Sequence, residues 1–257
     1  MACTRHAKGT AITSKNFISV ILTTYKRLEY IRPCLLSIIQ HTHVPVEFVI
    51  ADGGSGIDFC KELWHTVGGI WQPLLIPQFM FPMAAIPATE AINRAFGIAR
   101  GEYVMLANDD IEIETSDWAE RMTHHIETNP DAGVIGTMTR NSYLKQNVGA
   151  DYDCDAHIGE TKPIDQVAGT FCYVNRRIWH ELGGYDESFI GGGGDADYSI
   201  RVQAAGYKLL VAQDITVDHK QCRLAADKEA IREKYGVDSF DHRNIPHCIN
   251  VAKGLSK

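Results

Sequence analysis

The chain contains 257 residues, of which 45% are hydrophobic and 22% charged, values typical of a globular protein with a sizeable core. Its formal net charge of −7 argues against a general electrostatic attraction to nucleic acid or to anionic lipid. We therefore expect no nucleic-acid partner, although a local basic patch is compatible with an acidic whole.

The cysteine pattern and the hydropathy pattern point to one compartment. Seven cysteines are widely spaced without a C-x-x-C pair, which predicts neither a disulfide framework nor a zinc site and favours the cytoplasm. The first residues lack the apolar core of a signal peptide, and no apolar run approaches the ~18 residues that span a bilayer. We expect no transmembrane segment.

Strand and helix patterns alternate in the first half of the chain. An apolar, β-branched run at residues 17–25 precedes a helical pattern at 28–40, and residues 46–51 form a second apolar run. A helical pattern at 88–99 then leads into a short apolar strand at 103–107. Strand-helix-strand units of this spacing predict an α/β protein with a mostly parallel sheet.

The second half is less regular. We expect Ser116 and Asp117 to cap its first helix. Residues 139–164 are polar and patternless, and we interpret them as a surface segment over the site and not as a metal cluster. The other expected elements are strands at 132–138, 167–174, 208–212 and 215–217, and helices ending near 128, at 176–182, from about 195, and at 224–235.

Oxygen-rich side chains follow the predicted strands. Asn108, Asp109 and Asp110 come directly after the strand at 103–107, and Asp52 comes after the strand at 46–51. In open α/β sheets, ligands bind at the carboxyl ends of the strands, and carboxylate and amide oxygens suit Mg²⁺ or Mn²⁺. An aspartate-rich turn that caps the next helix explains the N-D-D run equally well.

Two residues in the second half extend this pattern. Asp195 follows the four-glycine loop at 191–194 and begins a helix, where aspartate is also an ordinary capping residue. His219 follows the last predicted strand, where it is either a metal ligand or a hydrogen-bonded structural residue. Several such residues in one sheet protein predict a single site.

Five segments occur in the order typical of the family 2 glycosyltransferases, and the chain resembles that family over roughly residues 17–222. The segments are V-I-L-T-T-Y, V-I-A-D-G-G-S, A-I-N-R-A-F-G-I-A-R-G-E-Y-V-M-L-A-N-D-D-I-E-I, G-G-Y-D-E-S-F and G-D-A-D-Y-S-I-R-V-Q-A-A-G-Y. The resemblance implies the GT-A fold, a Rossmann-like fold of nucleotide-diphospho-sugar transferases, in one domain over residues 1–222. This domain would have a nucleotide-binding half at about 17–115, an acceptor half at about 116–222, and a helical tail at 223–257.

The resemblance also implies which residues bind the nucleotide sugar. Thr23 and Tyr25 would line the nucleotide pocket, and Asp52 would accept a hydrogen bond from the pyrimidine ring. Asn93 and Arg94 would lie near the diphosphate or the sugar. Arg94 is the more natural phosphate partner because its guanidinium binds bidentately.

The run Asn108-Asp109-Asp110 would be the family's D-x-D motif, with asparagine in the first place. Asp110 would then bind Mn²⁺ or Mg²⁺ directly, and Asp109 would lie near the ribose. His219 matches a place where some members supply a further metal ligand. The asparagine lowers the negative charge of the site.

In the family's Glu-Asp motif, Asp195 would be the general base, with Asp197 and Arg201 orienting it. Gly194 stands where the family has glutamate. The resemblance therefore implies that the acceptor is held differently here, as for a different or larger acceptor. The implied reaction is an inverting transfer of a sugar from a UDP-, dTDP- or GDP-linked donor to a hydroxyl of a glycan, lipid-linked or other acceptor, in surface glycan or polysaccharide synthesis. A divalent cation would neutralise the departing diphosphate while a carboxylate accepts the proton.

Two other functions fit parts of the pattern. A sugar-nucleotide pyrophosphorylase shares a related sheet, but the glycine- and arginine-rich phosphate loop is missing near the first strand. A catalytically weak or inactive nucleotide-sugar-binding module fits the replacement of acids by Asn108 and Gly194. Four aromatic residues could form a surface on which a sugar stacks, or could be part of the core. They are Trp64, Trp71, Phe79 and Phe81.

Overall fold

The computed structural model describes residues 17–69, 75–142, 144–220 and 227–255. Trp71 and the expected start of the last helix, at residue 224, lie outside these ranges. The boundary expected at residue 222 between the domain and its tail also lies outside them.

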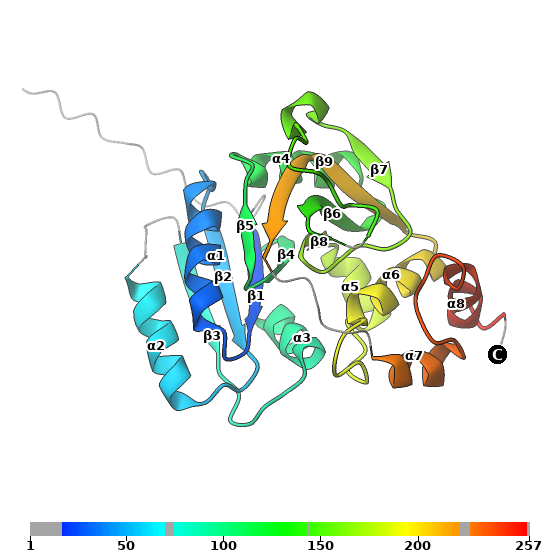
Figure 1. The fold of residues 1–257 in the computed structure, drawn as a ribbon, viewed down its shortest axis with the longest axis horizontal. Coiled ribbons are helices and arrows are strands. Elements are labelled where there is room, and N and C mark those ends of the chain that lie inside the picture. The colour runs from blue at the N-terminus through cyan, green and yellow to red at the C-terminus, as the bar shows by residue number, and fades with distance from the viewer. Residues whose placement is uncertain (1–16, 70–74, 143, 221–226, 256–257) are drawn as a thin grey trace, which may run out of the picture.

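Four parallel strands form the first part of a mixed sheet (Figure 1). Their order is β3 (Leu75–Met80), β2 (Val46–Asp52), β1 (Ile18–Thr24) and β4 (Tyr103–Asn108). In β1, β2 and β4 the apolar residues are buried on both faces, as expected for parallel strands between helices. The carboxyl ends of these strands meet at one edge, where Asp52 and Asn108 lie.

The second part of the sheet is mostly antiparallel. Here β8 (Phe171–Val174) pairs with β4 on one side and with β6 (Ala132–Arg140) on the other. Next comes β9 (Lys208–His219), which is parallel to β6 and antiparallel to both β5 (Ile111–Ile113) and β7 (Thr161–Pro163). The predicted α/β class with a mostly parallel central sheet flanked by helices is confirmed, with antiparallel strands added in the second part, and the GT-A type of fold is taken up with the comparisons below.

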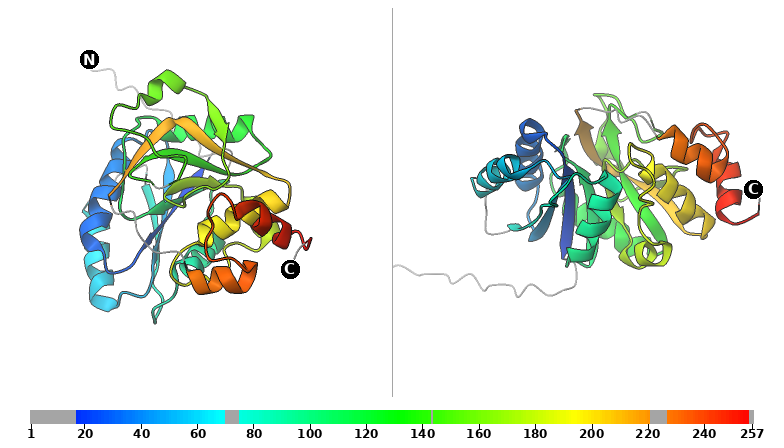
Figure 2. Two further views of the ribbon diagram at one scale, coloured as in Figure 1. Left: turned by 45° about the vertical axis from the view of Figure 1, so that its right-hand side comes forward. Right: turned by 90° about the horizontal axis from the view of Figure 1, so that it is seen from below.

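Helices cover both faces of the sheet (Figures 1 and 2). One face carries α1 (Leu28–Gln40), α2 (Ile57–Gly68) and α4 (Trp118–Thr128), and the other carries α3 (Ala88–Ile98), α5 (Arg176–Leu182) and α6 (Gly194–Ala204). Burial of these apolar helix stripes stabilises the fold at roughly 25 cal/mol per Å² removed from water.

A buried carboxylate joins the strands at the edge opposite the candidate site. Glu47 is the second residue of β2 and accepts hydrogen bonds from the Arg100 backbone N–H at 2.8 Å and from Arg100 Nε at 2.7 Å, and also from Ser19 and Gln78. Burial opposes ionisation of this carboxyl, but the hydrogen bonds outweigh it and lower its pKa. Glu47 is therefore a charged structural anchor.

Several elements differ from those predicted. The strand expected at 167–174 begins only at Phe171, because three backbone N–H groups before it donate to side chains: those of Val167, Ala168 and Gly169 bond Ser199, Gln146 and Asp195. The two expected last strands are one, since β9 continues through a register shift opposite Thr137 and Met138. The helix α2 and the strands β3, β5 and β7 were not predicted from the sequence, and neither was the one-turn helix at Cys154–His157.

The expected cap of α4 is wrong. Asp117 has φ of 57°, in the left-handed region, and its side chain makes no capping hydrogen bond. Its carboxylate instead pairs with Arg121 Nε at 3.0 Å, one turn along the helix. The ion pair replaces the cap because left-handed backbone directs the carboxylate away from the first N–H groups of the helix.

The C-terminal residues form two helices that pack on α6 (Figures 1 and 2). These are α7 (Lys228–Tyr235) and α8 (Ile245–Ala252), of which α8 was not predicted. A third apolar cluster joins them to the domain through Phe189, Ile200, Ile231, Tyr235 and Cys248. Within the described residues, none of the helices is both long and apolar enough to cross a bilayer.

Candidate functional site

A short strand brings two of the predicted residues together. Because β5 pairs with β9 so that Ile111 lies opposite His219, the preceding Asp110 lies beside the histidine ring. Asp110 Oδ1 is 3.2 Å from His219 Nε2, and Asn108 Nδ2 is 3.4 Å from the same nitrogen. Asp110 and His219 are 3% and 7% exposed. Residues 111 apart in sequence thus form one polar centre at the end of β4.

Two residues that the sequence reasoning missed hold the acidic motif. Thr24 Oγ1 donates to Asp109 Oδ2 at 2.8 Å. The guanidinium of Arg27 spans both carboxylates, with 3.2 Å from Nη1 to Asp109 Oδ1 and 2.8 Å from Nη2 to Asp110 Oδ2. The sequence signal that could have identified them is their position: Thr24 is the last residue of β1, and Arg27 follows two residues after Tyr25.

The two adjacent carboxyl groups differ in pKa. Burial raises the pKa of Asp109 to about 6, against the hydrogen bond from Thr24 and the charge of Arg27. Asp110 is also buried, but His219 and Arg27 together outweigh desolvation and lower its pKa. Asp110 is therefore the member of the pair held in the charged form that metal binding requires.

The donor set around Asp110 fits a hard divalent cation. Asp110 Oδ1 is a buried oxygen without a hydrogen bond, and so is available as a ligand. Its 3.2 Å separation from His219 Nε2 matches two neighbouring ligands of an octahedral ion with bonds of about 2.1 Å. No cluster of three or more metal-ligating side chains is found in the described part of the chain, so the remaining ligands would be water and phosphate oxygens.

The turn after β2 has a different organisation. Asp52 is fully buried, and its Oδ2 accepts from the backbone N–H groups of Gly54 at 3.0 Å and Ser55 at 2.8 Å, while its Oδ1 accepts from the Ser55 hydroxyl. Asp52 thus shapes the turn. Tyr25 lies beside this turn, because a Cβ on Gly53 would meet the tyrosine ring at 3.3 Å. The Tyr25 residue is 45% exposed. Thr23 lies half-buried near the end of β1.

The two predicted diphosphate residues on α3 point to different partners. Asn93 fixes the loop after α5, because its Nδ2 donates to Tyr185 O at 2.8 Å and its Oδ1 accepts from Tyr185 N at 2.9 Å. Arg94 is largely exposed and pairs with Glu90 one turn earlier on the helix. The structure places Asn93 in a structural contact and Arg94 on the surface.

Asp195 lies half-buried in the first turn of α6. Its Oδ2 accepts from Gly169 N at 2.9 Å, and the neighbouring Thr170 O accepts from Asn108 N at 2.9 Å. The loop before β8 therefore connects Asp195 to the end of β4. Gly194 packs against α3, where a Cβ would lie 2.7 Å from Thr89 Cγ2, so a glutamate does not fit there without movement.

Asp197 is a structural hub and Arg201 is one of its partners. Asp197 is fully buried, with Arg201 Nε at 2.8 Å, Tyr235 OH at 2.6 Å and Lys234 Nζ at 2.8 Å. Arg201 also donates to Leu182 O at 2.8 Å and to Gly184 O at 2.7 Å. The pair joins α6 to α5 and α7, and Asp197 lies two residues after Asp195 on the same helix.

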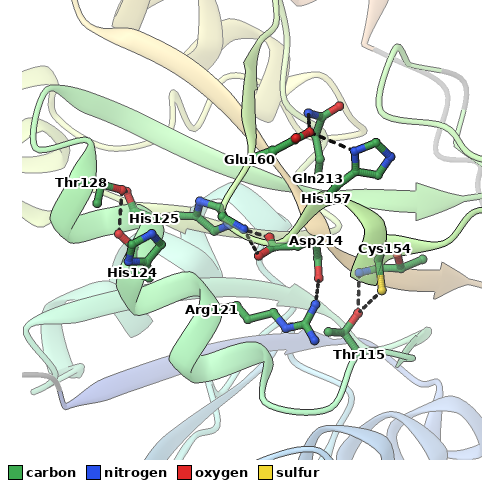
Figure 3. A network of polar contacts seen from close by, with 12 residues as sticks. Thr115, Arg121, His124, His125, Thr128, Cys154, His157, Glu160, Gln213 and Asp214 are labelled. Atoms are coloured by element: carbon green, nitrogen blue, oxygen red, sulfur yellow. Dashed lines mark hydrogen bonds and ion pairs between the residues drawn. The ribbon is translucent and has the colours of Figure 1, made fainter.

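The segment at 139–164 lies mainly along the first half of β9 (Figure 3). Asp214 anchors it: Oδ2 accepts from Gly159 N at 2.9 Å, while Oδ1 lies 2.5 Å from His125 Nε2 on α4. Its start reaches the last residues of β9, where Asn141 Nδ2 donates to Asp218 Oδ1 at 3.0 Å. The expectation that this segment lies over the site is wrong for its last part, because β7 pairs with Leu210–Ala212 and not with the end of β9.

Three aromatic side chains form a row at the outer edge of the sheet. The ring of Phe79 on β3 lies 4.9 Å from the ring of Trp64 on α2 and 5.5 Å from that of Phe81. Trp64 is 58% and Phe81 is 37% exposed, so the row is a surface and not part of the core. It lies on the edge strand, three strands away from β4.

Sequence comparison identifies the family. Residues 88–162 match Glycosyl transferase family 2, and this segment includes α3, β4 and the N-D-D motif. Over this segment the chain is similar to that family. The predicted family and the predicted enzyme class, a glycosyltransferase, are confirmed.

Solved glycosyltransferase structures share the fold. A mannosyltransferase from Pyrobaculum calidifontis, in complex with GDP-Man and Mn²⁺, aligns with a TM-score of 0.64 over 93% of this chain and 72% of its own, at 15% identity. GalNAc-T7 with UDP, GalNAc and Mn²⁺ aligns with a TM-score of 0.62 over 79% of this chain and 43% of its own, at 15% identity. S. aureus TarS 1–349 in complex with UDP aligns with a TM-score of 0.60 over 78% of this chain and 60% of its own, also at 15% identity. The predicted GT-A fold is confirmed.

One curated relative is an uncharacterised protein, y4gI, from Sinorhizobium fredii (strain NBRC 101917 / NGR234). It is 25% identical over 212 residues, which are 74% of this chain. The chain spans 23% of the length of that relative.

Proposed function

We propose that the chain transfers a sugar from a nucleotide-diphosphate sugar to an acceptor hydroxyl, with Mn²⁺ or Mg²⁺ and with inversion at the anomeric carbon. The observation that carries the proposal is the buried Asp110 Oδ1, which has no hydrogen bond and faces His219 Nε2 at the carboxyl edge of a family 2 fold. UDP-, dTDP- or GDP-linked sugars are the proposed donors, in line with the UDP and GDP-Man of the structural neighbours.

In this proposal Asp110 Oδ1 and His219 Nε2 would hold the divalent cation, and metal binding would replace the 3.4 Å contact of Asn108 Nδ2 with the same nitrogen. The cation would neutralise charge on the departing diphosphate. Tyr25 is exposed beside the turn of Asp52 and is available to stack on the base, while Thr23 and Asp109 complete the nucleotide side. Asp52 contributes by shaping this turn, since its oxygens already accept hydrogen bonds within it.

Asp195 is the proposed general base. The acceptor hydroxyl would give its proton to the Asp195 carboxylate while its oxygen bonds the anomeric carbon and the bond from that carbon to the diphosphate breaks. The hydrogen bond from Gly169 N to Oδ2 orients the carboxylate, and α6 presents its positive end there. Asp197 and Arg201 act as positioning residues because they fix the first turn of α6.

The proposed acceptor is a hydroxyl of a glycan or a lipid-linked molecule, in surface glycan or polysaccharide synthesis. Arg94 is exposed and pairs with Glu90, and in this proposal its guanidinium leaves Glu90 to bind the diphosphate of the donor. A cytoplasmic location rests on the spacing of the cysteines, and the net charge of −7 disfavours nucleic acid.

A thermal-shift panel tests the proposal. UDP, dTDP and GDP would be compared with and without Mn²⁺, because a ligand at 100 times its dissociation constant adds about 2.7 kcal/mol to the free energy of unfolding. One nucleotide should stabilise the parent chain only with Mn²⁺. Asp110→Asn should lose this shift, and Asp58→Asn, which removes an exposed carboxylate on α2, should keep it. Equal shifts in Asp110→Asn and the parent would contradict the assignment.

A nucleotide-sugar-binding module without turnover is the second candidate, favoured by Asn108 and by the close packing of Gly194 on Thr89. Hydrolysis of the donor sugar separates the two. The enzyme should release nucleoside diphosphate slowly in the absence of acceptor, whereas the module should bind the donor with the same metal dependence and release none.

A further inference from the structure

Arg27 occupies the place of a counter-ion in the candidate metal centre. Its guanidinium contacts Asp109 and Asp110 at 3.2 Å and 2.8 Å, so one positive charge is shared by the two carboxylates that begin the turn after β4. The two carboxylate side chains are 5% and 2% exposed, whereas the Arg27 side chain is 33% exposed. The acids are thus fixed in the interior, and their cationic partner reaches them from the surface.

One carboxylate group carries both interactions. Arg27 Nη2 bonds Asp110 Oδ2, while Oδ1 of the same group faces His219 without a hydrogen bond. Arg27 already places one positive charge beside this carboxylate. A divalent cation on Oδ1 would add two more, so that three positive charges would surround one partly desolvated group. Repulsion between like charges is strong at this range and depth. The two cations therefore oppose each other at Asp110.

The surroundings of Arg27 allow it to leave. It is the first residue before α1, and its guanidinium carbon lies 4.5 Å above the Tyr30 ring, one turn along the helix. The preceding Lys26 has φ of 54°, and its backbone N–H donates to Ser55 Oγ at 2.8 Å. The backbone is therefore fixed by the neighbouring turn, while the side chain is 33% exposed and long enough to move its guanidinium toward solvent along the Tyr30 ring that it already contacts.

We propose that Arg27 is a built-in counter-ion of the metal centre: it stabilises Asp109 and Asp110 without metal and is displaced when a divalent cation binds Asp110. This inference rests on the proposed function, since it takes Asp110 as a metal ligand. Because coupling between two binding events is reciprocal, a residue that opposes the metal must bind the acids less well when the metal is present. The acidic centre would then have a cationic partner in both states.

The test measures Mn²⁺ alone, with no nucleotide. Free Mn²⁺ would be followed by electron paramagnetic resonance during titration of the full chain. Arg27→Met removes the charge and keeps the length of the side chain, and we expect about a tenfold rise in Mn²⁺ affinity, the size of one charge-assisted hydrogen bond. Arg27→Gln keeps a hydrogen-bond donor without the charge and should show the same rise.

A matched control is Arg232→Met, which removes an equally charged residue paired with Asp238 on the far surface and should leave Mn²⁺ affinity unchanged. Thermal melting gives a second readout: Arg27→Met should melt lower than the parent without metal, and Mn²⁺ should raise its melting temperature by more than that of the parent.

The outcomes separate the inference from the proposed function. An affinity of Arg27→Met for Mn²⁺ no higher than that of the parent, undetectable binding included, overturns the inference. If Asp110→Asn abolishes Mn²⁺ binding in that case, the proposed metal site stands without the counter-ion. If Asp110→Asn binds Mn²⁺ as the parent does, the proposed metal site fails, and the inference fails with it.

Discussion

Asp110 and Asp197 are both buried carboxylates paired with an arginine, but their surroundings differ. Asp197 receives Arg201, Lys234 and Tyr235, so each of its oxygens has a partner. Asp110 receives Arg27 on one oxygen, and the other oxygen has no hydrogen bond. Burial and an arginine partner are therefore common to a structural hub and to a candidate ligand site. What separates them is an oxygen without a hydrogen bond that faces a histidine nitrogen at 3.2 Å.

The same distinction applies within α6. Asp195 and Asp197 lie two residues apart, yet Asp195 is half-buried with a single contact from another segment, and Asp197 is enclosed. In the sequence both are acids in the first turn of a helix. Both oxygens of Asp195 accept backbone N–H bonds, one of them from its own neighbour Ala196, but among the described residues no side chain donates to them. The following predictions test the contrast between such open acids and acids that side chains from other segments enclose.

The largest expected effect is on turnover. Asp195→Asn keeps the shape but removes the basic oxygen, so we expect a loss of sugar transfer of about 10²–10⁴-fold with little change in donor affinity. Initial rates and calorimetry with the donor would measure the two. The free energy of unfolding should change little. A normal transfer rate in this variant would show that the base is another residue.

Asp197→Asn should give the opposite result. It leaves Arg201 and Lys234 facing a neutral group in a buried hub, so we expect a loss of about 3 kcal/mol in the free energy of unfolding. Urea denaturation would measure it. The variant should keep nucleotide-dependent stabilisation, since Asp197 has no place on the donor side. A loss of less than about 0.5 kcal/mol, typical of a surface site, would contradict the hub.

A smaller effect is expected at Tyr235. Tyr235→Phe removes the 2.6 Å hydrogen bond to Asp197 and should lower the free energy of unfolding by about 1–2 kcal/mol. Tyr207→Phe is the matched control, because the Tyr207 hydroxyl bonds Glu181 at an exposed position. Its effect should stay within about 0.5 kcal/mol. Equal effects of the two variants would mean that α7 is not held through Asp197.

The smallest effect concerns pH. Glu47 resembles Asp197 in having its oxygens occupied, and its pKa is lowered in the folded chain. A lowered folded-state pKa adds stability above the unfolded value of about 4.3, and this stability is lost as the pH falls through the folded value. Unfolding free energies measured from pH 6 downward should therefore fall less steeply in Glu47→Gln than in the parent. Glu102→Gln, at an exposed position, should keep the parent's slope.

The sequence predicted the parts of the fold that local patterns determine. The strands β1, β2 and β4 are continuous apolar runs, and the N-D-D motif follows directly from the last of them. The sequence did not reveal β5, because three residues carry no periodicity, or α8, which lies after a polar stretch. Partners distant in sequence were hidden as well: Arg27 lies 83 positions from Asp110. Such contacts depend on strand order, which a local pattern does not contain.

The pairing of β5 with β9 has a consequence for how the chain tolerates changes in length. Alternate residues of a strand face opposite sides of the sheet, so a slip of one residue between Ile111 and His219 would turn the imidazole away from Asp110. An extra residue between β4 and β5 should be far more harmful than one in the loop after β5. The acid comes from the first half and the imidazole from the second, so neither fragment alone contains the pair. If the chain were divided after β5, the two pieces would have to reassociate to restore it.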